Sequence, residues 1–347
     1  MDIAKLLRVF NRNPNSRSQE SNRIVYLDLI KIVSAFMVVF YHMSSHMDLG
    51  GFVNSEYNIS VCQILMCVCS ASVPLFFMVN GALLLNKNYS TQTIYHKAAK
   101  IALLLVVWHF LKFPDWFFKT LIVLYLLYPI FIRIYNSQKK IYKYVLMAAV
   151  FCFPFLYNLG MIFLMRFFPN FEIGIFGKTI SLETIPLRTG AFTMYSILYF
   201  FLGGILFKKK LPDVVSILLC IAGLLIIIWG IIVYSNYTKE IADAVNACFP
   251  TVGTLLLSVG CFNLFQNFEK IHFNEKLLKV IGFFGNGVLC IYIFHPVFIN
   301  LIYGHILTNE QYGALIILPF AILILIACAV INAILSRIPL AKELVKI

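Results

Sequence analysis

Apolar runs of about twenty residues recur along the whole chain, separated by short polar segments. A helical run of this length crosses the roughly 30 Å hydrocarbon core of a bilayer. The pattern predicts an all-α, polytopic integral membrane protein of about ten transmembrane helices. We place them near residues 24–44, 60–85, 95–113, 116–135, 142–164, 191–207, 213–234, 245–265, 278–302 and 313–335.

Only Pro114 and Asp115 separate the third and fourth of these runs. The two runs form either a tight helical hairpin or a partly re-entrant pair, and the second case reduces the count to eight spans.

Composition supports a single membrane domain. Of 347 residues, 61% are hydrophobic and only 12% are charged, and the mean hydropathy is +0.87. These values lie outside the range of soluble globular domains. We expect a basic cytoplasmic segment at residues 1–22, a transmembrane domain at 23–337 and a short cytoplasmic tail at 338–347.

The net charge of +13 follows the predicted topology. With the N-terminus inside, 21 of the 28 Lys and Arg residues fall in inner segments and six in outer ones, which leaves Lys31 within the first span. This asymmetry favours an even number of spans with both termini cytoplasmic. It also explains the basic excess without a nucleic-acid partner, and it makes the lipid bilayer the partner of these charges.

The ionisable residues in the first span either anchor the helix at the membrane surfaces or form a functional site. Lys31 and His42 are eleven positions apart, about 16.5 Å along a helix and on one face. Asp28 stands one turn before Lys31, where opposite charges can pair. Lys31 either snorkels to the inner headgroups while His42 lies at the outer interface, or an anionic ligand enters near Lys31 and reacts near His42.

No spacing of metal ligands occurs in the sequence. The nine cysteines lie mostly in apolar runs and form no CxxC pair, and no His, Cys and Asp residues cluster at ligand spacing. We expect no metal cofactor.

Two stretches near the N-terminus carry a family resemblance. DLIKIVSAFMVVFYH, followed by SVPLFFMVNGALLL from Ser72, resembles the start of the acyltransferase-three family of integral membrane acyltransferases. Lys31 and His42 match its pattern of Arg or Lys, ten residues and His, whereas Asn80 stands in place of the usual Ser.

Later elements continue the resemblance in order, namely WFFKTLIVLYLLYPIF from Trp116, YSILYFFLGGILFKKK from Tyr195, and VLCIYIFHPVFI with Tyr292 and His295. Pro114 and Asp115 depart from the family pattern. The chain is most similar to the short, single-domain O-acetyltransferases of the family.

The resemblance implies transfer of an acetyl group from cytoplasmic acetyl-CoA to a hydroxyl of a cell-envelope glycan or lipid-linked saccharide, in a bacterial inner membrane. His42 is then the general base. His295 is a second acid or base, or a gate, and Asp28 supports this catalytic group by holding Lys31.

Further candidates follow from the same resemblance. Lys97 and Lys100 stand where the family has an Arg-x-x-Arg pair and, with Lys31, are candidate ligands for the donor phosphates. The alternative for the first two is ordinary positive-inside anchoring. Candidates for contacts with substrate or with the oxyanion are Asn80, Asn286, Tyr292 and Trp116, and the alternative is that they only connect helices.

Two other function classes stay open at this stage. A transporter or flippase of a lipid-linked glycan would also have many spans, intramembrane prolines and buried ionisable groups. A scaffold or sensor without catalysis is the second alternative. The oligomeric state is open.

Overall fold

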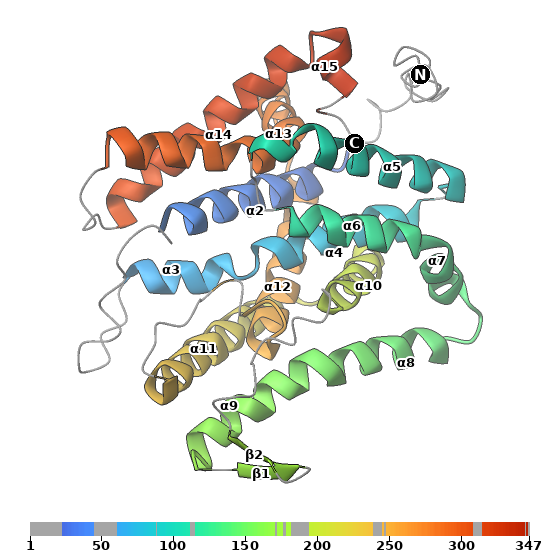
Figure 1. The fold of residues 1–347 in the computed structure, drawn as a ribbon. Coiled ribbons are helices and arrows are strands. Elements are labelled where there is room, and N and C mark those ends of the chain that lie inside the picture. The colour runs from blue at the N-terminus through green and yellow to red at the C-terminus, as the bar shows by residue number, and fades with distance from the viewer. Residues whose placement is uncertain are drawn as a thin grey trace.

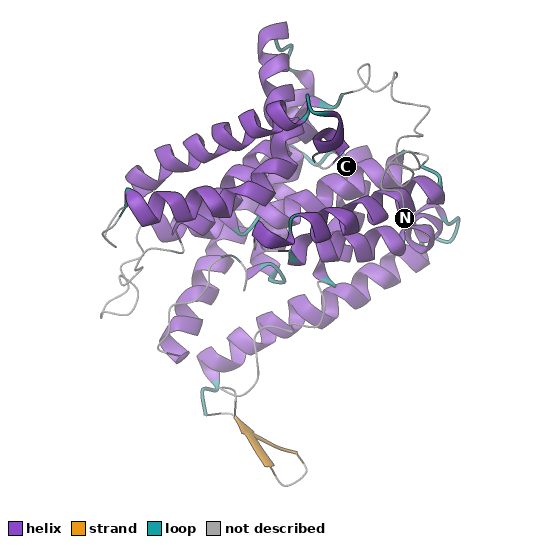
Figure 2. Ribbon diagram, turned by 45° about the horizontal axis from the view of Figure 1, so that its top comes forward, coloured by secondary structure: helices purple, strands orange, loops and turns teal. Residues whose placement is uncertain are grey.

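The computed structural model describes residues 23–44, 61–87, 89–111, 115–170, 172–175, 178–181, 194–238, 245, 248–307, 314–343 and 345. Helices make up almost all of this part of the chain and pack into one bundle (Figure 1). The all-α prediction is confirmed. A short antiparallel hairpin of β1 (Glu172–Ile175) and β2 (Lys178–Ser181) projects from one end of the bundle (Figure 2). The expected basic segment at residues 1–22 lies outside the described residues.

The helices follow the predicted order of spans. The first half of the chain contains α2 (Val25–Ser44), α3 (Val61–Cys69), α4 (Ser72–Asn86), α5 (Thr91–Val107), η1 (His109–Leu111), α6 (Trp116–Leu126), α7 (Tyr128–Asn136), α8 (Ile141–Val150), η2 (Phe151–Leu156) and α9 (Tyr157–Phe167). The second half contains α10 (Tyr195–Lys208), α11 (Asp213–Thr238), α12 (Val252–Phe265), η5 (Gln266–Lys270), α13 (Glu275–His305), α14 (Ala314–Leu335) and α15 (Pro339–Glu343).

Six helical stretches of the described chain are long and apolar enough to cross a membrane. They are Val25–Ser44, Gln63–Asn86, Ile141–Phe167, Asp213–Thr238, Glu275–His305 and Ile316–Leu335. Helices α6 and α7 pass the same test as a pair bent by 58°, which makes up to seven. The other predicted spans correspond to α5, α10 and α12, of 17, 14 and 14 residues. The polytopic membrane fold is thus confirmed, and the cytoplasmic position of the termini stays a prediction from charge.

Prolines lie at the breaks in two spans. Pro129 lies at the start of α7, directly after the bend that separates it from α6. Pro154 lies within η2, a π-helical turn between α8 and α9. Because proline has no N–H and its ring crowds the preceding turn, each of these positions weakens the regular α-helical ladder where the break occurs.

Helices α4 and α10 approach closely at two glycines. A Cβ atom on Gly81 would lie 1.7 Å from the carbonyl oxygen of Phe200, and one on Gly203 would lie 1.9 Å from that of Met78. Small residues permit such backbone contact, which is how helices gain packing energy in lipid. This crossing holds α4 and α10 together in the interior of the bundle (Figure 1).

Helices α2 and α13 run parallel and in contact, although they come from opposite ends of the chain. The guanidinium of Arg23, just before α2, donates to the carbonyl of Gly282 early in α13. At the other end, the Tyr303 hydroxyl donates to the Met43 carbonyl at 2.7 Å. The same direction is expected of the first and ninth spans in the ten-span order.

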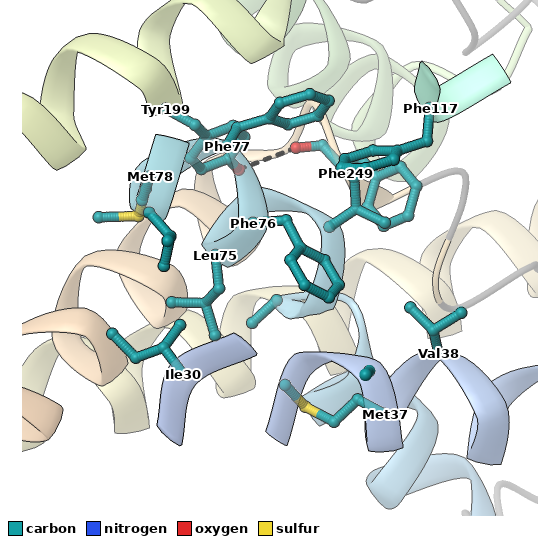
Figure 3. Packing of buried hydrophobic residues seen from close by; sticks show 14 of the residues in the cluster. Ile30, Met37, Val38, Leu75, Phe76, Phe77, Met78, Phe117, Tyr199 and Phe249 are labelled. Atoms are coloured by element: carbon teal, nitrogen blue, oxygen red, sulfur yellow. Dashed lines mark hydrogen bonds between the residues drawn. The ribbon is translucent and has the colours of Figure 1, made fainter. Parts of the chain in front are cut away.

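Aromatic and aliphatic side chains fill the space between α2, α4, α6 and α10. Figure 3 shows Met37 of α2 and Phe77 of α4 within this core, with Phe117 of α6 next to Phe77. The hydroxyl of Tyr199 donates to the carbonyl of Phe249 at 2.9 Å, so its polar atom is satisfied in the apolar interior. This packed core fixes the helices that carry the candidate site.

Candidate active site

Two histidines meet between α2 and α13. His42, in the last turn of α2, is partly buried, and His295, on α13, is fully buried. Their ring centroids lie 5.1 Å apart with an angle of 36° between the planes. The sequence singled out each residue separately, and the structure brings them together.

The hydrogen bond of His295 determines its tautomer. Its Nδ1 lies 2.9 Å from the carbonyl oxygen of Ile291. Because a carbonyl only accepts hydrogen bonds, Nδ1 carries the proton, and the neutral ring then has its lone pair on Nε2. That Nε2 atom is buried and has no hydrogen-bond partner among the described residues. A buried acceptor of this kind can take a hydrogen bond from a donor that enters the site.

Aromatic rings enclose the buried side of the histidine pair. The ring of Tyr292 lies 6.0 Å from that of His295, and it packs against Phe117 at 5.3 Å and Phe118 at 4.8 Å. Trp116 continues this cluster through an edge contact with Phe117. Tyr292, one of the predicted site residues, is the member of this aromatic cluster whose ring contacts His295. The enclosure lowers the local dielectric, which strengthens polar interactions within it.

A cluster of charges lies nearer the start of the same two helices. Asp28, which is 5% exposed, forms an ion pair with Lys31 at 2.5 Å and a second one with Arg23. Arg23 also donates to the carbonyl of Gly282 at 3.3 Å and to the Asn286 amide oxygen at 3.5 Å. Two cations thus compensate one buried carboxylate. The pairing of Asp28 with Lys31 is the one expected from their spacing.

This charge cluster is separate from the histidine pair. Along α2, Asp28 is about 21 Å and Lys31 about 16.5 Å from His42. Asp28 therefore acts on Lys31 and Arg23 rather than on the imidazole. Sequence reasoning missed Arg23, because an Arg at the entrance of a span is typical of an ordinary inner-face anchor.

Lys97 lies in a second basic cluster at the start of α5. It is partly buried, and its Nζ atom lies 5.2 Å from the ring centroid of Tyr89. The positive charges of Lys87 and Lys100 both act on it. Burial raises the pKa of the Tyr89 hydroxyl, so the ring stays neutral beneath the ammonium group. Three lysines in one place favour an anion among them.

The two asparagine candidates lie away from the histidines. Asn80 donates to its own helix at the Phe76 carbonyl and accepts from the Tyr125 hydroxyl, both at 2.9 Å, so it connects α4 to α6. Asn286 is exposed beside Arg23 and lies about 13.5 Å before His295 along α13.

The described part of the chain contains no set of side chains that could bind a metal ion. No group of three or more His, Cys, Asp or Glu side chains lies close enough there to hold an ion.

The bundle of apolar helices contains two groups of ionisable residues, the histidine pair and the Arg23–Asp28–Lys31 cluster. Such an arrangement is typical of intramembrane enzymes and of transporters. The comparison with known families decides between them. Residues 24–115 and 112–334 match the model of an acyltransferase domain, and the chain belongs to the acyltransferase-3 family. No curated protein and no solved structure matches the chain. The protein is a membrane acyltransferase, and the resemblance seen in the sequence is confirmed.

Proposed function

We propose that this acyltransferase moves an acetyl group from cytoplasmic acetyl-CoA to a hydroxyl of a cell-envelope glycan, presented as a lipid-linked saccharide in a bacterial inner membrane. The observation that carries the proposal is the contact between His42 and His295, where a base and a buried hydrogen-bond acceptor lie side by side. Transfer to a hydroxyl requires such a base inside the enclosed site.

His42 is the general base of the proposed reaction. A neutral imidazole nitrogen takes the proton of the acceptor hydroxyl as its oxygen bonds to the thioester carbonyl carbon. When the tetrahedral intermediate collapses, the carbon–sulfur bond breaks, and the imidazolium returns its proton to the departing thiolate. Direct transfer of this kind needs no acyl-enzyme, and the sequence shows no recognisable pattern of a Ser or Cys beside a His with a supporting carboxylate.

His295 orients His42 in this proposal. In the structure the Nε2 atom of His295 has no hydrogen-bond partner among the described residues. A small rotation of the adjacent His42 ring in the reacting complex would bring its N–H to this lone pair, so that the opposite nitrogen of His42 presents its own lone pair to the hydroxyl. A base held in one tautomer by a third group is a recurring arrangement in nucleophilic catalysis. Ile291 supports it by holding the proton of His295 on Nδ1.

The remaining candidate site residues are assigned proposed roles according to where they lie. Tyr292, which contacts the ring of His295, is the proposed oxyanion donor. Lys97 and Lys100 are the proposed ligands of the donor phosphates, with Lys31 nearer the thioester arm. Trp116 is the proposed edge of the acceptor site, since it continues the same aromatic cluster.

Mass spectrometry of envelope glycans tests the proposal. Cells make the intact protein, the His42→Ala variant or neither, and immunoblots of membranes verify equal amounts of both proteins. We expect an acetyl-sized mass on the glycan only with the intact protein. Unmodified glycans in all cells, together with altered amounts of glycan at the surface, would instead favour transport.

A further inference from the structure

A pocket of about 420 Å³ opens at the start of α13, apart from the histidine pair. Its walls combine charged, amide and apolar side chains. They are Arg23, Glu275, Leu278, Lys279, Gly282, Phe283 and Asn286. Along α13, Asn286 is the lining residue nearest His295, and it is still about 13.5 Å from it. The pocket is thus a separate site rather than an extension of the histidine pair.

Hydrogen-bond donors converge on this pocket. Arg23 uses Nε for Asp28 and Nη2 for Gly282 and Asn286, which leaves its Nη1 hydrogens without a partner among the described residues. Lys279 likewise has no ion pair within the described ranges. A guanidinium and an ammonium at one opening are suited to an anion with several oxygens, such as phosphate.

The charge balance around the pocket favours an anion. Asp28 neutralises only one of its two cations, Arg23 and Lys31, so this cluster keeps one positive charge. Glu275 offsets Lys279 among the lining residues. One negative charge in the pocket would complete the balance.

The position of the pocket along the membrane normal indicates that a lipid supplies that anion. Helix α13 has 31 residues and is about 46 Å long, which exceeds the roughly 30 Å hydrocarbon core. The first turns of α13 are exposed and carry the charges of Glu275, Lys276 and Lys279, which are unfavourable in the hydrocarbon core, so the overhang lies at this end. The pocket therefore lies at the level of the lipid headgroups.

Apolar side chains beside the donors suit an acyl chain. Leu278 and Phe283 line the pocket and are exposed, and Val280 is exposed on the same turns. A free phosphate ion would gain nothing from these side chains, whereas the glycerol and first methylenes of a phospholipid would cover them.

We propose that this pocket binds the headgroup phosphate of an anionic phospholipid, with Arg23 and Lys279 on the phosphate oxygens and Leu278 and Phe283 against the acyl chain. The bound lipid neutralises the excess charge of the Arg23–Asp28–Lys31 cluster. This binding is independent of which acyl group the enzyme transfers and of its acceptor.

Native mass spectrometry of the purified full-length protein tests the proposal with dioleoylphosphatidylglycerol and dioleoylphosphatidylcholine as probes. We expect the intact protein to bind the anionic lipid more tightly. Lys279→Gln should weaken that binding about tenfold or more, because it removes a charge-assisted hydrogen bond to the phosphate. Lys276→Gln is the matched control, because Lys276 is exposed on the same overhang but does not line the pocket. Equal losses in the two variants would overturn the site and leave only general surface charge.

A second measurement separates lipid from soluble phosphate. Phe283→Ser should weaken binding of phosphatidylglycerol and leave the binding of inorganic phosphate unchanged. If inorganic phosphate at millimolar concentration displaces the lipid from the intact protein, or if Phe283→Ser has no effect on lipid binding, the pocket is a soluble-anion site and the lipid assignment is wrong.

Discussion

Among the described residues, the buried Nε2 atom of His295 has no hydrogen-bond partner, and the ring of His295 lies 5.1 Å from that of His42. This relationship makes the two rings functionally unequal. The hydrogen bond to Ile291 fixes the proton of His295, whereas His42 is the ring with partial exposure. Substitutions at the two positions should therefore have different effects.

Replacing His295 tests whether its lone pair matters rather than its bulk. His295→Gln keeps an acceptor oxygen near the position of Nε2, whereas His295→Met fills the space without one. We expect acetyl transfer by purified protein to fall about 100-fold in the Met variant and about tenfold in the Gln variant, through kcat rather than KM. Equal losses, or losses confined to KM, would contradict the orienting role.

Removing the carboxylate of Asp28 should destabilise the start of α2. Asp28→Asn leaves Arg23 and Lys31 as adjacent, uncompensated cations, at a cost of about 3 kcal/mol. We expect a lower melting temperature in detergent, together with a higher KM for the donor because Lys31 is no longer held. Asp115→Asn is a control, since Asp115 pairs with Lys119 at an exposed position. A similar loss in both variants would argue against a special role for the buried carboxylate.

The lysines of α5 should affect the donor and not the acceptor. Lys97→Gln and Lys100→Gln each remove one cation from the cluster beside Tyr89. We expect KM for acetyl-CoA to rise about fivefold to tenfold per lysine, and the difference to shrink in high salt. Lys139→Gln, an exposed lysine elsewhere on the predicted inner face, serves as the control. Unchanged donor KM in the α5 variants would show that these lysines only anchor the helix.

The crossing of α4 and α10 should not tolerate a methyl group. Gly81→Ala and Gly203→Ala each place a Cβ within 2 Å of a backbone carbonyl oxygen, so the helices must separate. We expect each variant to lose about 3 kcal/mol or more, visible as reduced membrane abundance and a lower melting temperature. In contrast, Gly160→Ala and Gly304→Ala meet nothing within 4 Å and should leave stability unchanged or slightly raised. Normal melting of Gly81→Ala would contradict this account of the crossing.

The hydrophobic pattern was sufficient to locate the helices, because a run of about twenty apolar residues has few other stable conformations. It was less informative about where short helices begin. The predicted span at 245–265 starts as a helix only at Val252, because the Thr251 side chain accepts from the Thr254 N–H and caps it there.

The partners of individual side chains could not be predicted in the same way. Periodicity shows which residues share a face of α2, but not that α13 covers that face. Asn80 was expected to need a partner, yet only the packed structure identifies that partner as Tyr125. Arg23 carried no signal to distinguish it from other inner-face arginines until its contact with Asp28 was seen.

The unequal lengths of the helices give this protein an uneven thickness. Helices α10 and α12 have 14 residues each and are about 21 Å long, whereas α11 and α13, with 26 and 31 residues, reach about 39 and 46 Å. The short pair lies in the interior, and α12 packs against α2, the helix of His42. Within the described residues, neither α10 nor α12 alone is long enough to cross the roughly 30 Å hydrocarbon core of a bilayer.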